Sequence, residues 1–152
     1  MKKISVLIFV FIMFCFCSIS NDFSQNLFCL SSDAKVSFYC DEENFVKDAI
    51  MLINGQSFVV ETSAEFALET YKNLHSCVGF SIVFNKDEID LGKILEKVNI
   101  IEEEIIEDNF TIYGIAQGLS FSTFVNNKKV NIQIAQNDDF VIIGSPIILG
   151  CY

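Results

Sequence analysis

The sequence contains no arginine and no tryptophan, and it has one proline and one histidine in 152 residues. Ten Lys therefore supply all side-chain positive charge against twenty Asp and Glu, and the formal net charge is -10. Nucleic acids and anionic membrane surfaces are bound mainly by Lys and Arg, which neutralise phosphates. The composition therefore argues against both as partners.

The scarcity of proline leaves no sign of an interdomain linker, because no Pro-rich or low-complexity stretch occurs. A chain of 152 residues is typical of one domain, and 51% hydrophobic with 20% charged residues is typical of a globular fold. We expect an irregular leader or short first element at 21–33, followed by a single domain over 34–152.

The first twenty residues resemble a secretory signal peptide. Lys2 and Lys3 precede an apolar run over positions 4 through 17, and small residues follow at 18–20. The run is shorter than the ~17 to 25 residues that usually span a bilayer. We expect cleavage after Ser20 and an extracytoplasmic protein, either secreted or, if uncut, membrane-anchored at the cell envelope. An uncut N-terminal segment would be its one contact with a membrane.

Cleavage would change both the charge and the cysteine content. It removes two Lys and no acid, so 8 Lys would face 20 carboxylates and the formal charge would be -12. It also removes Cys15 and Cys17, whose bulky preceding residues disfavour the alternative of a lipid anchor. The remaining cysteines are Cys29, Cys40, Cys77 and Cys151. They allow three disulfide pairings, and buried free thiols are the alternative.

Hydrophobic periodicity predicts strands and helices in the first half of the chain. Alternating or β-branched residues predict three strands, at 34–40, 56–62 and 78–84. Apolar residues at helical spacing predict three helices, at 42–53, at about 63–74 and from about residue 90. Asn54-Gly55 is expected to end the first helix, and Thr62 with Glu65 to form a capping box that opens the second.

The second half predicts strands alone, separated by turn residues such as Asn, Asp and Gly. The predicted strands lie at 100–107, 110–117, 120–126, 130–136 and 139–149. Helices in the first half and a C-terminal meander in the second predict an α+β domain. We expect an antiparallel sheet with two to three helices packed on one face.

Few residues are arranged for catalysis. His75 and Cys77 are the one pair that suggests a thiol nucleophile and its base, but side chains two residues apart on a strand lie ~7 Å apart. No phosphate-binding, nucleophile-elbow or zinc-ligand spacing occurs. We therefore expect a non-enzymatic protein with no catalytic residue, cofactor or metal.

Glu102 and Glu104 offer the least unfavourable catalytic alternative, because they share one face of a predicted strand. The favoured interpretation is that Glu102–Glu104 protect an edge strand against aggregation, with Ile105 and Ile106 supplying its burial. A cell-envelope hydrolase that uses this pair is accordingly the third hypothesis for function.

Sixteen phenylalanines suggest either a Phe-rich core or an apolar surface. Three of them, Phe110, Phe121 and Phe124, fall in the predicted meander. If the helices cover part of the sheet, these rings could line a groove for an apolar ligand or a partner. A carrier of an apolar ligand is therefore the second hypothesis.

The C-terminal segments KKVNIQIA (128–135) and VIIGSPIILGCY (141–152) resemble the end of the YwmB family. The similarity consists of a V-N-x-Q-x-A strand, then a strand with G-[ST]-P that closes on an aromatic residue. The residues that carry it are Val130, Asn131, Gln133, Ala135, Gly144, Ser145, Pro146 and Tyr152. The resemblance implies a TATA-box-binding-protein-like fold in an exported protein of Gram-positive bacteria, with no catalytic residues to carry over.

Such a fold name suggests DNA binding, which the absence of Arg and the signal-like start oppose. The first hypothesis is therefore a non-catalytic binding or assembly module at the bacterial cell envelope. Its partner would be an envelope protein that the sequence does not identify.

Overall fold

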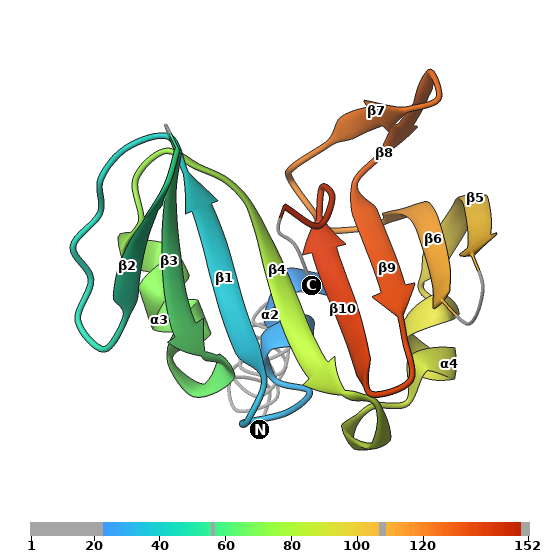
Figure 1. Ribbon diagram of the computed structural model, residues 1–152, viewed down its shortest axis with the longest axis horizontal. Coiled ribbons are helices and arrows are strands. Elements are labelled where there is room, and N and C mark those ends of the chain that lie inside the picture. The colour runs from blue at the N-terminus through green and yellow to red at the C-terminus, as the bar shows by residue number, and fades with distance from the viewer. Residues whose placement is uncertain (1–22, 56, 107–108, 150–152) are drawn as a thin grey trace, which may run out of the picture.

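The computed structural model describes residues 23–149 apart from 56, 107 and 108 (Figure 1). The expected signal peptide, Cys151 and Tyr152 lie outside these residues. The elements, in chain order, are α2 (Phe23–Phe28), β1 (Lys35–Cys40), β2 (Ile50–Asn54), β3 (Ser57–Ser63), α3 (Ala64–Asn73), β4 (Cys77–Asn85), η1 (Lys86–Glu88), α4 (Leu91–Leu95), β5 (Val98–Ile106), β6 (Asn109–Ala116), β7 (Thr123–Val125), β8 (Lys128–Val130), β9 (Ile132–Gln136) and β10 (Phe140–Ser145).

The central feature is an eight-stranded antiparallel sheet with the order β2-β3-β1-β4-β10-β9-β6-β5. The helices lie behind it in Figure 1, so the predicted α+β class with helices on one face is confirmed. The C-terminal strands β5, β6, β9 and β10 pair as antiparallel neighbours in chain order, as the predicted meander requires. Strand β10 pairs with β4, which joins the two halves of the chain, and β7 with β8 forms a separate hairpin. The TATA-box-binding-protein-like fold stays a prediction.

The core lies between the sheet and the helices. Alternation along β1 places Val36, Phe38 and Cys40 fully inside it. The ring of Phe28 from α2 packs edge-on against Phe38 and against Phe80 of β4, at centroid distances of 5.8 and 5.2 Å. Helix α2 is therefore the short first element that was one of the two expectations for 21–33, and it contributes Phe23, Leu27 and Phe28 to the core.

The helix predicted at 42–53 is absent, and that prediction was wrong. Residues 41–49 form a loop, and Ile50–Asn54 is strand β2, paired with β3. Asp48 has a φ of 60°, which interrupts a right-handed helix. Asn54-Gly55 therefore does not end a helix, because it begins the tight connection between two strands that pair from Asn54 to Ser57.

The helix predicted at about 63–74 is confirmed as α3, but its predicted capping box does not form. Ser63 rather than Thr62 occupies the N-cap position, and no side chain caps the helix there. The Thr62 hydroxyl instead donates a hydrogen bond to the Asp48 carbonyl, at 3.2 Å. This threonine therefore holds the 41–49 loop against β3.

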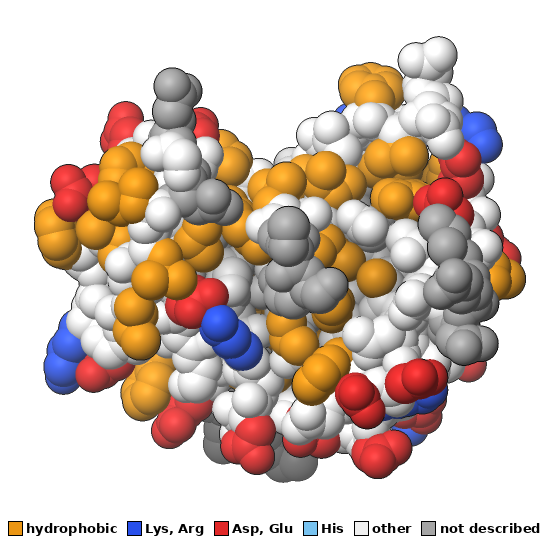
Figure 2. Space-filling view, in the orientation of Figure 1, with side chains coloured by type: hydrophobic (Ala, Val, Ile, Leu, Met, Phe, Trp, Pro, Cys, Tyr) orange, Lys and Arg blue, Asp and Glu red, His pale blue; other side chains and the backbone are white. Residues whose placement is uncertain are grey.

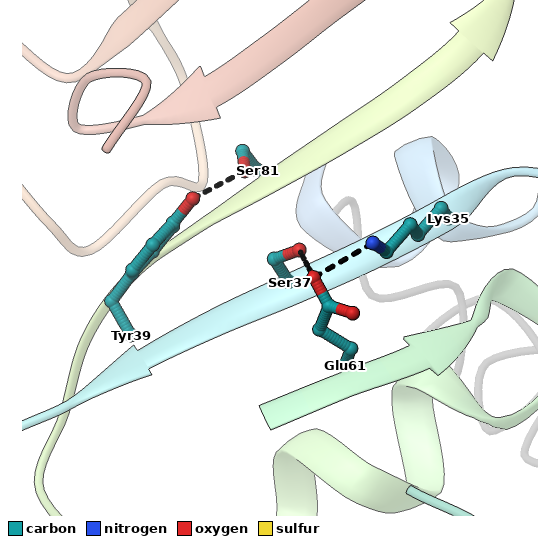
Figure 3. A network of polar contacts seen from close by, with 5 residues as sticks. All are labelled: Lys35, Ser37, Tyr39, Glu61 and Ser81. Carbon is teal, nitrogen blue, oxygen red and sulfur yellow. Dashed lines mark hydrogen bonds and ion pairs between the residues drawn. The ribbon is translucent and has the colours of Figure 1, made fainter. Parts of the chain in front are cut away.

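The sheet face opposite the helices carries two sets of polar contacts. Glu61 forms an ion pair with Lys35 at 2.7 Å and accepts a hydrogen bond from Ser37 at 3.5 Å (Figure 3). Tyr39 and Ser81, both buried, share a hydrogen bond of 2.9 Å between their hydroxyls. These contacts link β3, β1 and β4 on this face.

Candidate interaction surface

The two edges of the sheet differ in chemistry. Strand β2 has the sequence IMLIN and carries no charge, whereas β5 at the opposite edge contains Glu102–Glu104. Ile50, Leu52 and Ile53 of β2 are 65%, 45% and 72% exposed. Charged side chains on an edge discourage another strand from pairing there, and an uncharged apolar edge permits it. Charged side chains therefore protect the β5 edge, and the β2 edge lacks them.

The loop before β2 has a defined structure because a buried side chain holds it. Asn44 is buried, and its amide donates to the Glu42 carbonyl at 2.8 Å and to the His75 carbonyl at 3.0 Å. Its Oδ1 accepts from the His75 backbone N–H at 2.7 Å. These bonds attach the loop to the connection between α3 and β4.

Phe45 follows Asn44 directly and is 87% exposed. Phe45 and Met51 both line a cleft of about 520 Å³ between this loop and the sheet. An exposed aromatic ring on a fixed backbone loses little conformational entropy when a partner covers it. We call Phe45, Ile50, Leu52 and Ile53 the β2 surface.

Acidic residues flank the β2 surface. Asp41, Glu42 and Glu43 are all exposed on the same loop. The one loop cation, Lys47, lies 3.8 Å from the Asp48 carboxylate, and Lys35 on β1 is engaged by Glu61. Figure 2 shows apolar side chains over β2 and β3 with acidic side chains beside them. The surface is thus apolar with a negative margin.

Sequence reasoning missed the β2 surface because it assigned 42–53 to a helix. The signal that could have found it is Asn54-Gly55 between two apolar runs, which is a strong hairpin signal. A hairpin there makes Ile50–Ile53 a strand, and a short strand next to an irregular loop is a natural sheet edge.

The three phenylalanines expected to line a groove differ in their burial. Phe110 on β6 and Phe121 pack against the core, and the Phe121 ring lies 6.5 Å from the ring of Tyr71. Phe124 is 71% exposed on the β7–β8 hairpin. Of these three rings, two are therefore used by the core and one faces solvent.

The glutamates of β5 occupy the edge of the sheet, as the favoured interpretation expected. Glu102 accepts a hydrogen bond from Asn126 at 2.6 Å and lies 3.6 Å from the Lys128 ammonium, so it holds the β7–β8 hairpin. Glu104 lies opposite Thr111 of β6. Burial and the negative charges of Glu104 and Glu102 raise the pKa of the nearby Tyr113. Ile105, expected to be buried, is 73% exposed because β5 has no neighbour beyond it among the described strands.

The described cysteines Cys29, Cys40 and Cys77 are free thiols in this structure. Burial raises the pKa of Cys77 to about 12, although the hydrogen bond from its thiol to the Gly79 carbonyl lowers that pKa. Burial also raises the pKa of Cys40. A nucleophilic cysteine needs the opposite shift. His75, an exposed residue, contributes its backbone to Asn44.

The residues behind the YwmB resemblance have structural contacts. Asn131 exchanges two hydrogen bonds of 2.8 Å with the backbone of Ala116, and Ser145 donates to the Asn131 carbonyl at 2.9 Å. Gln133 accepts from the Ile148 backbone N–H at 2.9 Å. These side chains fix β9, β10 and the segment after β10, so the motif describes a fold rather than a site.

Comparison of the chain with family models, curated proteins and solved structures finds no match. Within residues 23–149, with the gaps at 56 and 107–108, no helix is long and apolar enough to cross a membrane. The same part of the chain contains no cluster of three His, Cys, Asp or Glu side chains that could hold a metal ion.

Proposed function

We propose that the chain is a non-catalytic binding module of the extracytoplasmic cell envelope, and that its partner binds along the β2 surface. The observation that carries this proposal is the uncharged edge strand with three exposed aliphatic side chains. Large exposed apolar residues gathered on one edge are typical of interaction sites. The signal-like start and the YwmB resemblance support the location.

The partner is a protein segment in extended conformation. An edge strand has one row of backbone N–H and C=O groups without a strand partner, and an added strand satisfies them. The cleft beside Met51 accommodates an apolar side chain of that segment, and the Phe45 ring would cover this side chain. Backbone pairing supplies affinity, and the cleft supplies selectivity.

Charge defines the partner further. The three exposed acidic residues at 41–43 border the surface, and the chain as a whole carries a formal charge of -10. Basic side chains on the partner would therefore be attracted, whereas a second copy of this chain would bring like charges together. We assign the partner segment alternating apolar and Lys or Arg residues.

Binding of synthetic peptides tests this assignment. A labelled ten-residue peptide of alternating Val and Lys is expected to bind, measured by fluorescence anisotropy at low salt, and one of alternating Val and Glu is not. The variant Ile53→Lys should weaken binding at least tenfold, because it places a charge on the edge and repels the basic peptide.

Ile105→Lys on the opposite edge is the matched control. Ile53 and Ile105 are 72% and 73% exposed, so neither substitution disturbs the core. Equal loss of binding in both variants, or binding of neither peptide, would overturn the proposal. Light scattering, which measures the oligomeric state, tests whether a second copy of the chain binds instead. A dimer that Ile53→Lys dissociates would show that the occupant is a second copy.

The other two hypotheses receive less support. The carrier hypothesis required Phe110, Phe121 and Phe124 to share a surface, whereas Phe110 and Phe121 pack against the core and Phe124 is exposed. The hydrolase hypothesis required Glu102 and Glu104 to be free for chemistry, whereas Glu102 is engaged by Asn126 and Lys128.

A further inference from the structure

Cys40 and Cys77 lie opposite each other where β1 ends and β4 begins. The pairing register shifts at this point, because Tyr39 pairs with Gly79 but Cys40 pairs with Cys77. Val78 is therefore an extra residue on β4. Without this bulge, Val78 would stand opposite Cys40. The bulge is thus what brings the two cysteines together.

The geometry of an opposed pair suits a disulfide. Residues directly opposite each other in antiparallel strands have Cα atoms about 4.5 to 5.5 Å apart, and disulfides join Cα atoms about 4.4 to 6.8 Å apart. The two thiols are close enough to affect each other's pKa: Cys77 lowers the pKa of Cys40, and Cys40 raises the pKa of Cys77. Cys29, by contrast, is exposed beyond the end of α2.

We propose that Cys40 and Cys77 form a disulfide when the chain meets a disulfide oxidant, and that this is the pairing among the described cysteines. The Cys77 sulfur, which is partly exposed, attacks the oxidant's disulfide and releases one thiol. The buried Cys40 sulfur then attacks Cys77 and releases the second thiol. Two cysteine thiols become one disulfide, and the oxidant's disulfide is reduced to two thiols that take up the two protons.

The disulfide would close the base of the segment that carries the β2 surface. Residues 41–76, between the two cysteines, include β2, β3 and α3. The Asp41 N–H already donates to the Ser76 carbonyl at 3.1 Å, next to the bonds between Asn44 and His75. A covalent link beside these hydrogen bonds restricts the unfolded chain, and it should raise the Tm by about 10 °C.

The folded reduced pair should oxidise slowly at neutral pH. Burial keeps the Cys77 thiol protonated, with a pKa of about 12, and the thiolate is the species that attacks a disulfide. The pair is therefore formed most readily during folding or by an oxidising enzyme, and once formed it is shielded at the buried Cys40.

Peptide mapping tests the pairing on the unmodified full-length chain. The chain is folded with glutathione disulfide, its free thiols are blocked with N-ethylmaleimide in denaturant, and it is cleaved after Lys. Cys40 then lies in peptide 36–47 and Cys77 in peptide 73–86, whereas Cys29 precedes Lys35 and Cys151 follows Lys129. The mass of peptide 36–47 linked to peptide 73–86 is given by the Cys40–Cys77 pairing alone. We expect peptide 36–47 joined to peptide 73–86.

Two further measurements complete the test. The double variant Cys29→Ser with Cys151→Ser should keep the linked peptide and the Tm difference of about 10 °C between oxidised and reduced samples. A link from Cys29 or Cys151 to either cysteine would overturn the proposal. Blocking of both Cys40 and Cys77 by N-ethylmaleimide, or a stable glutathione adduct on Cys77, would overturn it equally.

Discussion

Asn44 binds both backbone polar groups of His75, with its Oδ1 at 2.7 Å from the N–H nitrogen and its Nδ2 at 3.0 Å from the carbonyl oxygen. This one buried side chain joins the loop that carries Phe45 to the start of β4. The loop and the β4 connection are therefore expected to lose order together.

Asn44→Ala should lower the free energy of unfolding by about 2 kcal/mol, because three hydrogen bonds are lost. The loss is limited because His75 is exposed and water can replace part of its hydrogen bonding. Urea denaturation measures the change. Asn73→Ala removes one exposed hydrogen bond to Glu69 and should cost less than about 0.5 kcal/mol. Equal costs for the two variants would contradict the function assigned to Asn44.

Asn131→Leu should lower the free energy of unfolding by about 2 to 4 kcal/mol. Asn131 is buried, and leucine would leave the buried Ala116 backbone groups without its two hydrogen bonds. Asn137→Ala, at an exposed turn, should cost about 1 kcal/mol because water can replace its bonds. Thermal unfolding of both variants gives the comparison, and the reverse order would refute the prediction.

Gly144→Ala should be destabilising by about 1 to 3 kcal/mol, because a Cβ there would lie 2.6 Å from the backbone of Ile147 and Ile148. The matched control is Gly92→Ala in α4. Its nearest contact would be 3.3 Å from an Asp90 side-chain oxygen, and alanine favours the helix by about 0.5 to 1 kcal/mol. Chemical denaturation should therefore shift in opposite directions for the two variants. A stable Gly144→Ala chain would mean that the segment after β10 does not fold back onto the strand.

The Cys77 thiol predicts a loss of stability in alkaline solution for the reduced chain. Its pKa is raised by burial from 9.0 to about 12 in the folded state, so the unfolded state ionises first as pH rises. The contribution of this thiol to the free energy of unfolding is fully present below pH 9 and is lost as the pH rises toward 12. Urea midpoints measured with a reductant from about pH 8 to about pH 10.5 should fall more steeply for the natural chain than for Cys77→Ala. Parallel pH profiles would argue against a buried thiol.

Much of the fold could be predicted from the sequence where a single period dominates. Val36, Phe38 and Cys40 alternate, and β1 forms with all three in the core. Helix α3 follows a clear helical period and forms within one residue of its expected bounds. In these segments the local pattern and the tertiary burial agree.

The prediction failed where one pattern fits two structures. The apolar residues of 45–53 satisfy helical spacing, yet Ile50–Ile53 is also a short apolar run, which a strand accommodates equally well. Pairing with β3 decided the outcome, and that long-range contact is invisible to a local period. The β2 surface was missed because these residues were assigned to a helix. The Cys40–Cys77 pairing was equally hidden, because it depends on a one-residue bulge at Val78.

The unlike edges of the sheet limit how large an assembly can grow. A sheet that is receptive at both ends can add copies without end and becomes a fibre. Here three glutamates on β5 disfavour pairing at that edge, whereas β2 carries no charge. If β2 binds a strand as proposed, the chain would terminate a sheet instead of extending it, and each copy would hold one partner strand.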